Sequence, residues 1–313
     1  MADAGCNIVF GDSFGHEPYL IEAAKEFPNV QFCHATGTQA KQENLPNYHN
    51  AFASIYNGRF LAGVVAGLKL NEMIESGKIT AEQAKIGYVG AWDYAEVKSG
   101  FTSFFLGARY ICPSVTMEVV YTSSWFDIAK EKEAAQNLIA GGCVLISQHA
   151  DSEGAPKACE IAGVPNVAYN ISTISLGPTT ALISSKINWE PYFDMIINAV
   201  INKEAIPVDY CGGIENGVVM LTEINEAVAA EGTQAVLDEV SAKLISGEIK
   251  VFDTNTWTYK GEKLDSYLAD IDGDYVGETN VIHDGYFDES NAETFRSAPY
   301  FDIIIDGISA PER

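Results

Sequence analysis

The alternation of two hydrophobic periods along the chain constrains its fold most. Short runs rich in β-branched and aromatic residues alternate with longer stretches whose apolar residues recur three and four positions apart. This alternation is typical of βαβ units and a parallel sheet. We expect strands over 7–10, 29–33, 85–89, 116–121, 143–147, 167–169, 181–185 and 218–221. We expect helices over 18–27, 53–76, 96–108, 128–140, 154–162, 191–203 and 227–245. The fold class is therefore a doubly wound α/β chain, with too many strands for one sheet, so two lobes fit better than one.

The charge and cysteine content exclude several classes of function. The chain of 313 residues carries 19 basic and 43 acidic side chains, a net charge of −24. Such a chain repels phosphate backbones and anionic membranes, so we expect no nucleic-acid partner. The six cysteines have no zinc-like spacing and no apolar run is long enough to span a bilayer. We expect neither a metal nor a cofactor.

Candidate ligand-binding residues follow the strands, because open parallel sheets bind ligands beyond the carboxyl ends of their strands. The candidates are Asp12, Ser13, Phe14, Trp92, Tyr94, Trp125, Phe126, Asp127, Asp151, Asn170 and Ser172. Aromatic faces with a few polar groups suit a flat, uncharged ligand that carries hydroxyls, such as a nucleoside, a nucleobase or a sugar. No lysine, arginine or glycine-rich phosphate loop lies among these tips, which disfavours a phosphorylated ligand. The alternative for each aromatic residue is simple packing beneath its own loop.

Four further segments have recognisable patterns, three of which could suggest other chemistry. Residues 11–15 read G-x-S-x-G between a strand and a helix, as in a serine hydrolase, but only ten residues precede Gly11 and no oxyanion loop is available. His149, Asp151 and Ser152 are too close in sequence to form a relay and are interpreted as a polar strand end. Residues 256–264 predict a hairpin turning at Lys260-Gly261. The acidic loop after it begins at Asp270, but Val281 stands where a calcium loop needs glutamate, so we expect a solvated turn.

The combined motifs resemble the basic membrane protein family, the substrate-binding lipoproteins of ABC importers related to the purine nucleoside receptor. The resemblance covers nearly the whole chain and is carried by DSFG at 12–15, EFPNV at 26–30, HATG at 34–37, GYVG at 87–90, WFD at 125–127, QHADS at 148–152, NWEPY at 188–192 and SGEIKVFD at 246–253. It implies a type I periplasmic-binding-protein fold, with two lobes joined by a hinge that close on a ligand without chemistry. It implies lobes over 1–112 plus 177–207 and over 113–176 plus 208–250, with a C-terminal extension over 251–313.

The resemblance also implies site roles and partners. It places Trp125 in the stacking position of the second lobe, and it expects an acidic ribose-binding residue where this chain has Asn170. It implies an ABC permease as partner, a monomer, and an extracytoplasmic protein that is lipid-anchored in its full-length form. Family members carry two βα units before the strand at 7–10, so we expect an incomplete first lobe. A serine hydrolase using Ser13, or a ligand-sensing regulator, is the alternative function.

Overall fold

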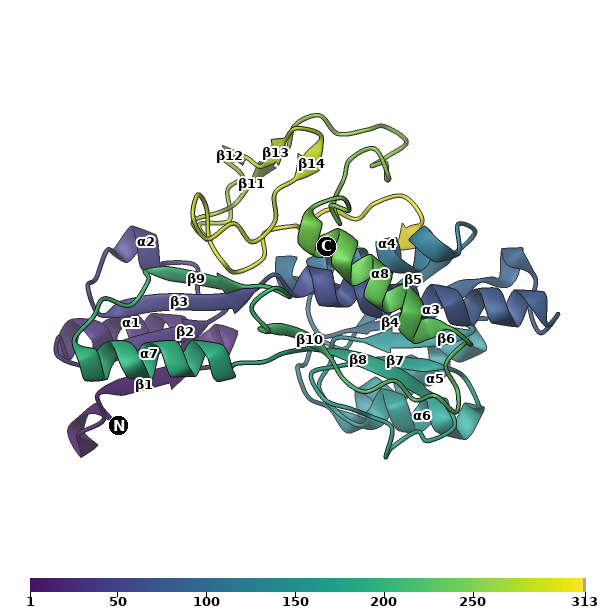
Figure 1. Ribbon diagram of the computed structural model, residues 1–313, viewed down its shortest axis with the longest axis horizontal. Helices are drawn as coiled ribbons and strands as arrows, with labels where there is room; N and C mark the ends of the chain where they lie inside the picture. The colour runs from purple at the N-terminus through teal and green to yellow at the C-terminus, as the bar shows by residue number, and fades with distance from the viewer. Residues whose placement is uncertain (312–313) are drawn as a thin grey trace. The chain divides into compact units, whose positions relative to one another are not determined.

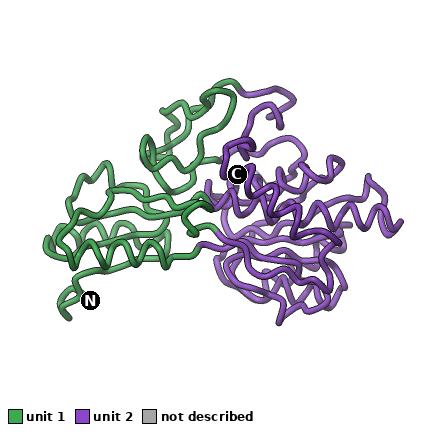
Figure 2. Tube along the Cα trace, viewed as in Figure 1, with its two compact units in different colours: residues 1–54, 188–219, 265–301 green, residues 55–187, 220–264, 302–313 purple. Residues whose placement is uncertain are grey.

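Two sheets organise the computed structural model, which describes residues 1–311 (Figure 1). The chain divides into two compact units (Figure 2). Unit 1 comprises residues 1–54, 188–219 and 265–301. Unit 2 comprises residues 55–187, 220–264 and those from 302 onward. Each unit is described by itself below.

Unit 1 is built on a four-stranded parallel sheet in the order β1-β2-β3-β9. Its strands are β1 (Ile8–Gly11), β2 (Gln31–Ala35), β3 (Tyr48–Ala53) and β9 (Asp209–Gly212). Its helices are η1 (Ala2–Ala4), η2 (Phe14–His16), α1 (Glu17–Glu26), α2 (Ala40–Glu43) and α7 (Glu190–Asn202). The order places β1 at one edge of the sheet and β9 at the other.

Successive residues of β2 face opposite sides of this sheet, as the strand period of two requires. Phe32 packs in one buried cluster with Ile21 and Ala24 of α1. Cys33 packs in another with Tyr192 and Ile196 of α7. The helices thus cover both faces, which is the three-layer arrangement that the alternating pattern predicts.

Residues 265–301 complete unit 1 with two small antiparallel ladders. The first pairs β11 (Leu268–Ala269) with β12 (Thr279–Asn280), and the second pairs β13 (Ile282–His283) with β14 (Tyr286–Phe287). Phe287 lies in the centre of an aromatic cluster there, with its ring centroid 4.7 Å from that of Phe301. This segment is therefore a packed part of the unit.

Unit 2 contains a seven-stranded sheet in the order β10-β8-β7-β6-β4-β5-β15. The strands are β4 (Lys85–Gly90), β5 (Thr116–Tyr121), β6 (Leu145–Gln148), β7 (Asn166–Tyr169), β8 (Ala181–Ile187), β10 (Val219–Leu221) and β15 (Ile308–Ser309). The pairs from β8 through β15 are parallel. The carboxyl ends of β4, β5, β6 and β7 therefore meet along one edge.

Helices cover both faces of the sheet in unit 2. They are α3 (Ile55–Glu75), η3 (Ala81–Gln83), α4 (Ala95–Ile111), α5 (Ile128–Ala140), α6 (Gly154–Ala162) and α8 (Thr233–Ser246). Tyr88 of β4 meets Phe101 of α4, whereas the next residue, Val89, joins the buried cluster of α5 and α6. Helices α4 and α5 consequently lie on opposite faces.

The contact between α3 and α4 is close because glycines line it. A Cβ atom on Gly63 would lie 2.0 Å from the carbonyl oxygen of Phe104, and one on Gly107 would lie 2.0 Å from that of Phe60. No side chain fits at such a distance, so the two backbones can approach only through glycine. This contact fixes the direction of both helices across the sheet.

The units have other boundaries than the expected lobes. Residues 55–112, expected in the first lobe, lie in unit 2 because α3 and α4 pack on each other there. Residues 209–212 lie in unit 1 because β9 pairs with β3. The expected extension over 251–313 is divided between both units.

Local differences from the expected elements have physical reasons. The helix expected over 227–245 begins only at Thr233, because Gly232 takes a left-handed φ of 79° that no α-helix continues. The hairpin at Lys260-Gly261 is confirmed as a tight turn, since Tyr259 and Glu262 exchange backbone hydrogen bonds of 2.8 and 3.1 Å. Both turn residues have positive φ, as a type I′ turn requires.

Candidate functional site

Aromatic side chains gather along the carboxyl edge of the sheet in unit 2. Trp92 and Tyr94 follow β4 and stack with centroids 5.9 Å apart and an interplanar angle of 16°. The ring centroid of Tyr94 lies 6.3 Å from that of Trp125, which follows β5. His149 follows β6, with its ring 6.1 Å from that of Trp125 and 5.1 Å from that of Tyr169. We call these five rings the aromatic row.

The backbone ties the loops that carry the row to each other. The amide of Asp151 donates to the carbonyl oxygen of Trp125 over 2.8 Å, which joins the loop after β5 to the loop after β6. Trp92, Tyr94 and Trp125 are each partly exposed. The strand tips therefore bring together three of the predicted aromatic residues and leave part of each ring open to a ligand.

Hydrogen-bond acceptors lie beside the row. Asp151 faces solvent, and its Oδ1 accepts a hydrogen bond of 3.3 Å from Nδ2 of Asn170. Desolvation by the surrounding protein raises the pKa of Asp151 to about 6, and the Asn170 amide opposes this change. The carboxylate is ionised at neutral pH and can accept a hydrogen bond from a ligand hydroxyl.

Of the three other predicted residues of unit 2, two have partners of their own and one is exposed. Asp127 caps α5, accepting from the amides of Ala129 and Lys130 at 3.1 and 3.0 Å. The hydroxyl of Ser172 donates to Glu223 over 2.7 Å. Phe126 is 63% exposed. A ligand role for these three stays a prediction.

A buried arginine that the strand-tip rule did not reveal lies beneath the row. Arg59 of α3 is 1% exposed, and its Nη1 donates to the carbonyl oxygen of Gln148 over 3.0 Å. Its Cζ lies 3.4 Å from the ring centroid of Tyr169, a cation–π contact. In the sequence, Arg59 is marked only as a lone arginine beside the longest apolar run. Its position beneath the row depends on where α3 lies in the folded chain.

In unit 1 the candidates Asp12, Ser13 and Phe14 follow β1. Asp12 is exposed and lies 3.6 Å from Nδ1 of His16, and Phe14 is 38% exposed. The buried His34 at the end of β2 donates through Nε2 to the carbonyl oxygen of Ser13 over 2.9 Å. The loop is thereby held against the neighbouring strand.

The G-x-S-x-G turn lacks the geometry of a nucleophile elbow. Ser13 precedes the short helix η2 with extended backbone. Among residues 1–311, no histidine nitrogen makes a hydrogen bond with its hydroxyl oxygen; His34 bonds its carbonyl oxygen instead. A serine nucleophile needs a base within hydrogen-bond reach, so this arrangement favours the turn interpretation.

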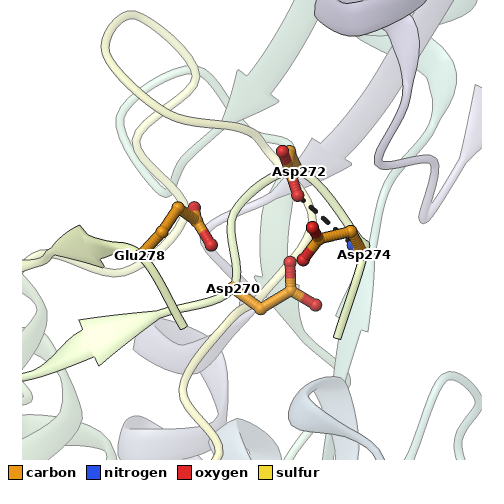
Figure 3. A group of neighbouring side chains, drawn as sticks. All are labelled: Asp270, Asp272, Asp274 and Glu278. Carbon is orange, nitrogen blue, oxygen red and sulfur yellow. Dashed lines mark hydrogen bonds between the residues drawn. The ribbon is translucent and has the colours of Figure 1, made fainter. Parts of the chain in front are cut away.

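The acidic loop between β11 and β12 is the cluster of described residues that could hold a cation. One carboxylate oxygen from each of Asp270, Asp272, Asp274 and Glu278 lies within 4.8 Å of the others, and the side chains converge (Figure 3). The same oxygens close the loop: Asp270 accepts from the amides of Gly273 and Tyr275 at 2.7 and 2.9 Å. This use of the carboxylates agrees with the expected turn.

No helix among the described residues combines the length and hydropathy that crossing a bilayer would need.

Comparison with known proteins identifies a family model and relatives that match this chain. The model of the PnrA-like ABC transporter substrate-binding proteins matches residues 1–255. A purine-binding protein of Brucella abortus (strain 2308) is 30% identical over 287 residues, covering 87% of this chain and 77% of that protein. A Haloferax volcanii protein, named provisionally as an ABC transporter glucose-binding protein, is 29% identical and covers 87% of this chain and 67% of its own length.

A solved structure supports the fold. The ABC transporter solute-binding protein from Conexibacter woesei DSM 14684 superposes with a TM-score of 0.61 at 22% identity, covering 80% of each chain. The expected periplasmic-binding-protein fold, of α/β class with parallel sheets, is confirmed.

Proposed function

The chain belongs to the family of PnrA-like ABC transporter substrate-binding proteins, and from this we propose that it binds a nucleoside-like ligand and delivers it to an ABC permease. Proteins of this family work outside the cytoplasm as solute receptors. The ligand class is the part of the proposal that the site geometry supports.

The observation that carries the proposal is the aromatic row beside a carboxylate. A purine base offers a flat face to Trp125 or Trp92, and stacking on an aromatic side chain contributes about 1 to 3 kcal/mol per base. Asp151 offers an acceptor to a ribose hydroxyl. A sugar alone would use the acceptor and stack less extensively, so the row favours a nucleoside.

Asn170 stands where the resemblance expects an acidic residue, and its contact suggests how the site compensates. Its amide donates to Asp151, which orients a carboxylate one strand away. We infer that Asp151 supplies the negative charge that position 170 lacks. The Brucella relative is named for purine binding, in accord with this ligand class.

The remaining parts of the proposal concern partners and location. We propose binding without covalent chemistry, a monomeric receptor, and a lipid anchor. Labelling with a fluorophosphonate tests the serine hydrolase alternative, because an activated Ser13 would react and a serine in an ordinary turn would not.

Calorimetry on the purified chain tests the ligand class directly. The panel comprises adenosine, guanosine, inosine, uridine, the free purines and glucose. We expect micromolar or tighter binding of a purine nucleoside, with glucose bound at least tenfold more weakly. Binding of glucose alone, or of no member of the panel, would contradict the proposed ligand class.

A further inference from the structure

Arg59 is a buried cation with an unusual set of partners. Among residues 1–311, no carboxylate oxygen lies within 4.0 Å of its guanidinium. Its polar contacts are the carbonyl oxygen of Gln148 at 3.0 Å and Nδ1 of His149 at 3.1 Å. Burying a charge without an ion partner is costly, so the arrangement calls for a role beyond packing.

The arginine determines the tautomer of His149. A guanidinium has only donors, so Nδ1 of His149 must accept and the ring proton of a neutral imidazole must lie on Nε2. Burial lowers the pKa of His149, and the charge of Arg59 lowers it further, against the opposing effect of Glu96. The ring therefore stays neutral, and Nε2 directs its proton toward Oε1 of Glu96 at 3.4 Å.

Glu96, in the first turn of α4, accepts the hydrogen bond from Nε2 of His149. Its side chain is 17% exposed. Within the described part of the chain, its second oxygen, Oε2, accepts no hydrogen bond. Glu96 therefore contacts the aromatic row through His149, and its second oxygen can still accept a hydrogen bond.

A glycine one turn further along α4 makes room for this arrangement. A Cβ atom on Gly100 would lie 2.9 Å from Nδ1 and 3.1 Å from Cε1 of His149. Any side chain at position 100 would displace the imidazole from its place between Arg59 and Glu96. The fold therefore provides the space that this contact needs.

We propose that Glu96 is a ligand-binding residue, and that Arg59 and His149 are positioning residues that hold its carboxylate beside the aromatic row as an acceptor. The inference rests on the proposed function and deepens it. The ligand group that fits is an uncharged hydroxyl or exocyclic amine on a ring system stacked in the row. His149 supplies one hydrogen bond to the carboxylate, and the ligand supplies the second.

Nitrogen-15 NMR tests the positioning step without any ligand. In the wild-type chain we expect a neutral His149, with a proton on Nε2 and none on Nδ1 at pH 7. In Arg59→Met the cation that disfavours the imidazolium is lost while Glu96 remains, so we expect the pKa of His149 to rise, with burial still opposing protonation. The other charged or titratable groups near the ring are Tyr88, Tyr169 and Asp151, and the variant leaves them unchanged. A proton on Nδ1 of the wild-type ring would overturn the assignment.

Binding measurements test the role of Glu96 with the tightest ligand of the panel. Glu96→Gln should weaken binding by about tenfold to a hundredfold, because a hydrogen bond to a charged acceptor is lost. The matched control is Glu133→Gln, which removes the same charge from the exposed face of α5 and should leave affinity unchanged. Equal affinity of Glu96→Gln and the wild type would overturn the ligand-binding role.

Two further variants separate positioning from folding. Gly100→Ala displaces the imidazole while Glu96 and every charge remain, so affinity should fall about tenfold in a folded chain. His149→Gln keeps one acceptor for Arg59 and one donor for Glu96, so it should retain more affinity than His149→Phe. Equal loss in both His149 variants would overturn the positioning role of His149. A wild-type chain that binds no panel member would contradict the proposed function instead, and the NMR result would still decide the tautomer assignment.

Discussion

Asn170 donates a hydrogen bond from its side-chain amide to Oδ1 of Asp151 over 3.3 Å, across the tips of the paired strands β6 and β7. The contact keeps a carboxylate at the edge of the aromatic row although the protein around it disfavours the charge. Its pKa of about 6 lies close enough to neutrality to affect binding in the physiological range.

Ligand affinity should therefore fall as the solution is acidified. Asp151 is exposed, but the protein beside it removes part of the water around its carboxylate and raises its pKa to about 6. The carboxylate is therefore ionised at pH 7 and mostly protonated at pH 5. If the ligand binds the ionised form, its affinity should fall about tenfold between these pH values. Calorimetry across this range measures the effect, and Asp151→Asn should bind more weakly at pH 7 without this pH dependence. A wild-type affinity that does not change with pH would contradict the assignment.

Removing the indole of Trp125 should weaken ligand binding without unfolding the chain. The ring is partly exposed at the centre of the row, so Trp125→Ala should cost about 1 to 3 kcal/mol of binding free energy through lost stacking. Tyr110→Ala is the control, because this 49% exposed ring lies in the last turn of α4, whereas the aromatic row lies near its first turn. An unchanged dissociation constant for Trp125→Ala would exclude the stacking role.

The glycine contact between α3 and α4 should be intolerant of even one methyl group. Gly107→Ala places a Cβ 2.0 Å from a backbone oxygen, which cannot move without shifting α3. We expect about 1 to 3 kcal/mol of lost unfolding free energy, or more, in chemical denaturation. Gly15→Ala is the comparison, because nothing lies within 4 Å of its Cβ position and its φ is not positive. Equal stabilities of the two variants would show that the helices can separate at little cost.

Asp127 offers a way to separate capping from ligand binding. Asp127→Ala removes both bonds to the amides at the start of α5 and should cost about 0.5 to 2 kcal/mol of stability. Asp127→Asn keeps an acceptor at the same place and should preserve most of that stability. Thermal unfolding and ligand titration of both variants give the result. A loss of affinity in the stable Asn variant would support the predicted ligand contact, and unchanged affinity would leave Asp127 as a cap alone.

Much of the fold could be predicted from local pattern. The helices over 128–140 and 154–162 have the predicted bounds, because their apolar faces are regular and a glycine follows each of them. Strand β3 (Tyr48–Ala53) was not predicted, because His49 and Asn50 interrupt the apolar pattern. The strand is buried throughout, and His49 bonds Gln31 and the carbonyl oxygen of Pro207, which are partners that only the fold supplies.

In the candidate site, too, some residues could be predicted from the sequence and others depend on the fold. Trp92, Tyr94 and Trp125 could be predicted because parallel strands bring their tips to one edge. Arg59 and Glu96 could not, because they lie on helices, and their meeting at His149 depends on how α3 and α4 cross. The packing of glycines against backbone oxygens determines that crossing, and the hydrophobic periodicity of the sequence does not indicate it.

The division of unit 1 into three separate stretches has a consequence for synthesis. Strand β3 ends at residue 53, but its partner β9 is made only after another 155 residues, and the segment over 265–301 comes later still. Strands β4 to β8, by contrast, are contiguous in the chain between residues 85 and 187. During translation this central block can assemble while β3 still lacks its partner β9, so contacts of long sequence separation would limit the rate at which the nascent receptor matures.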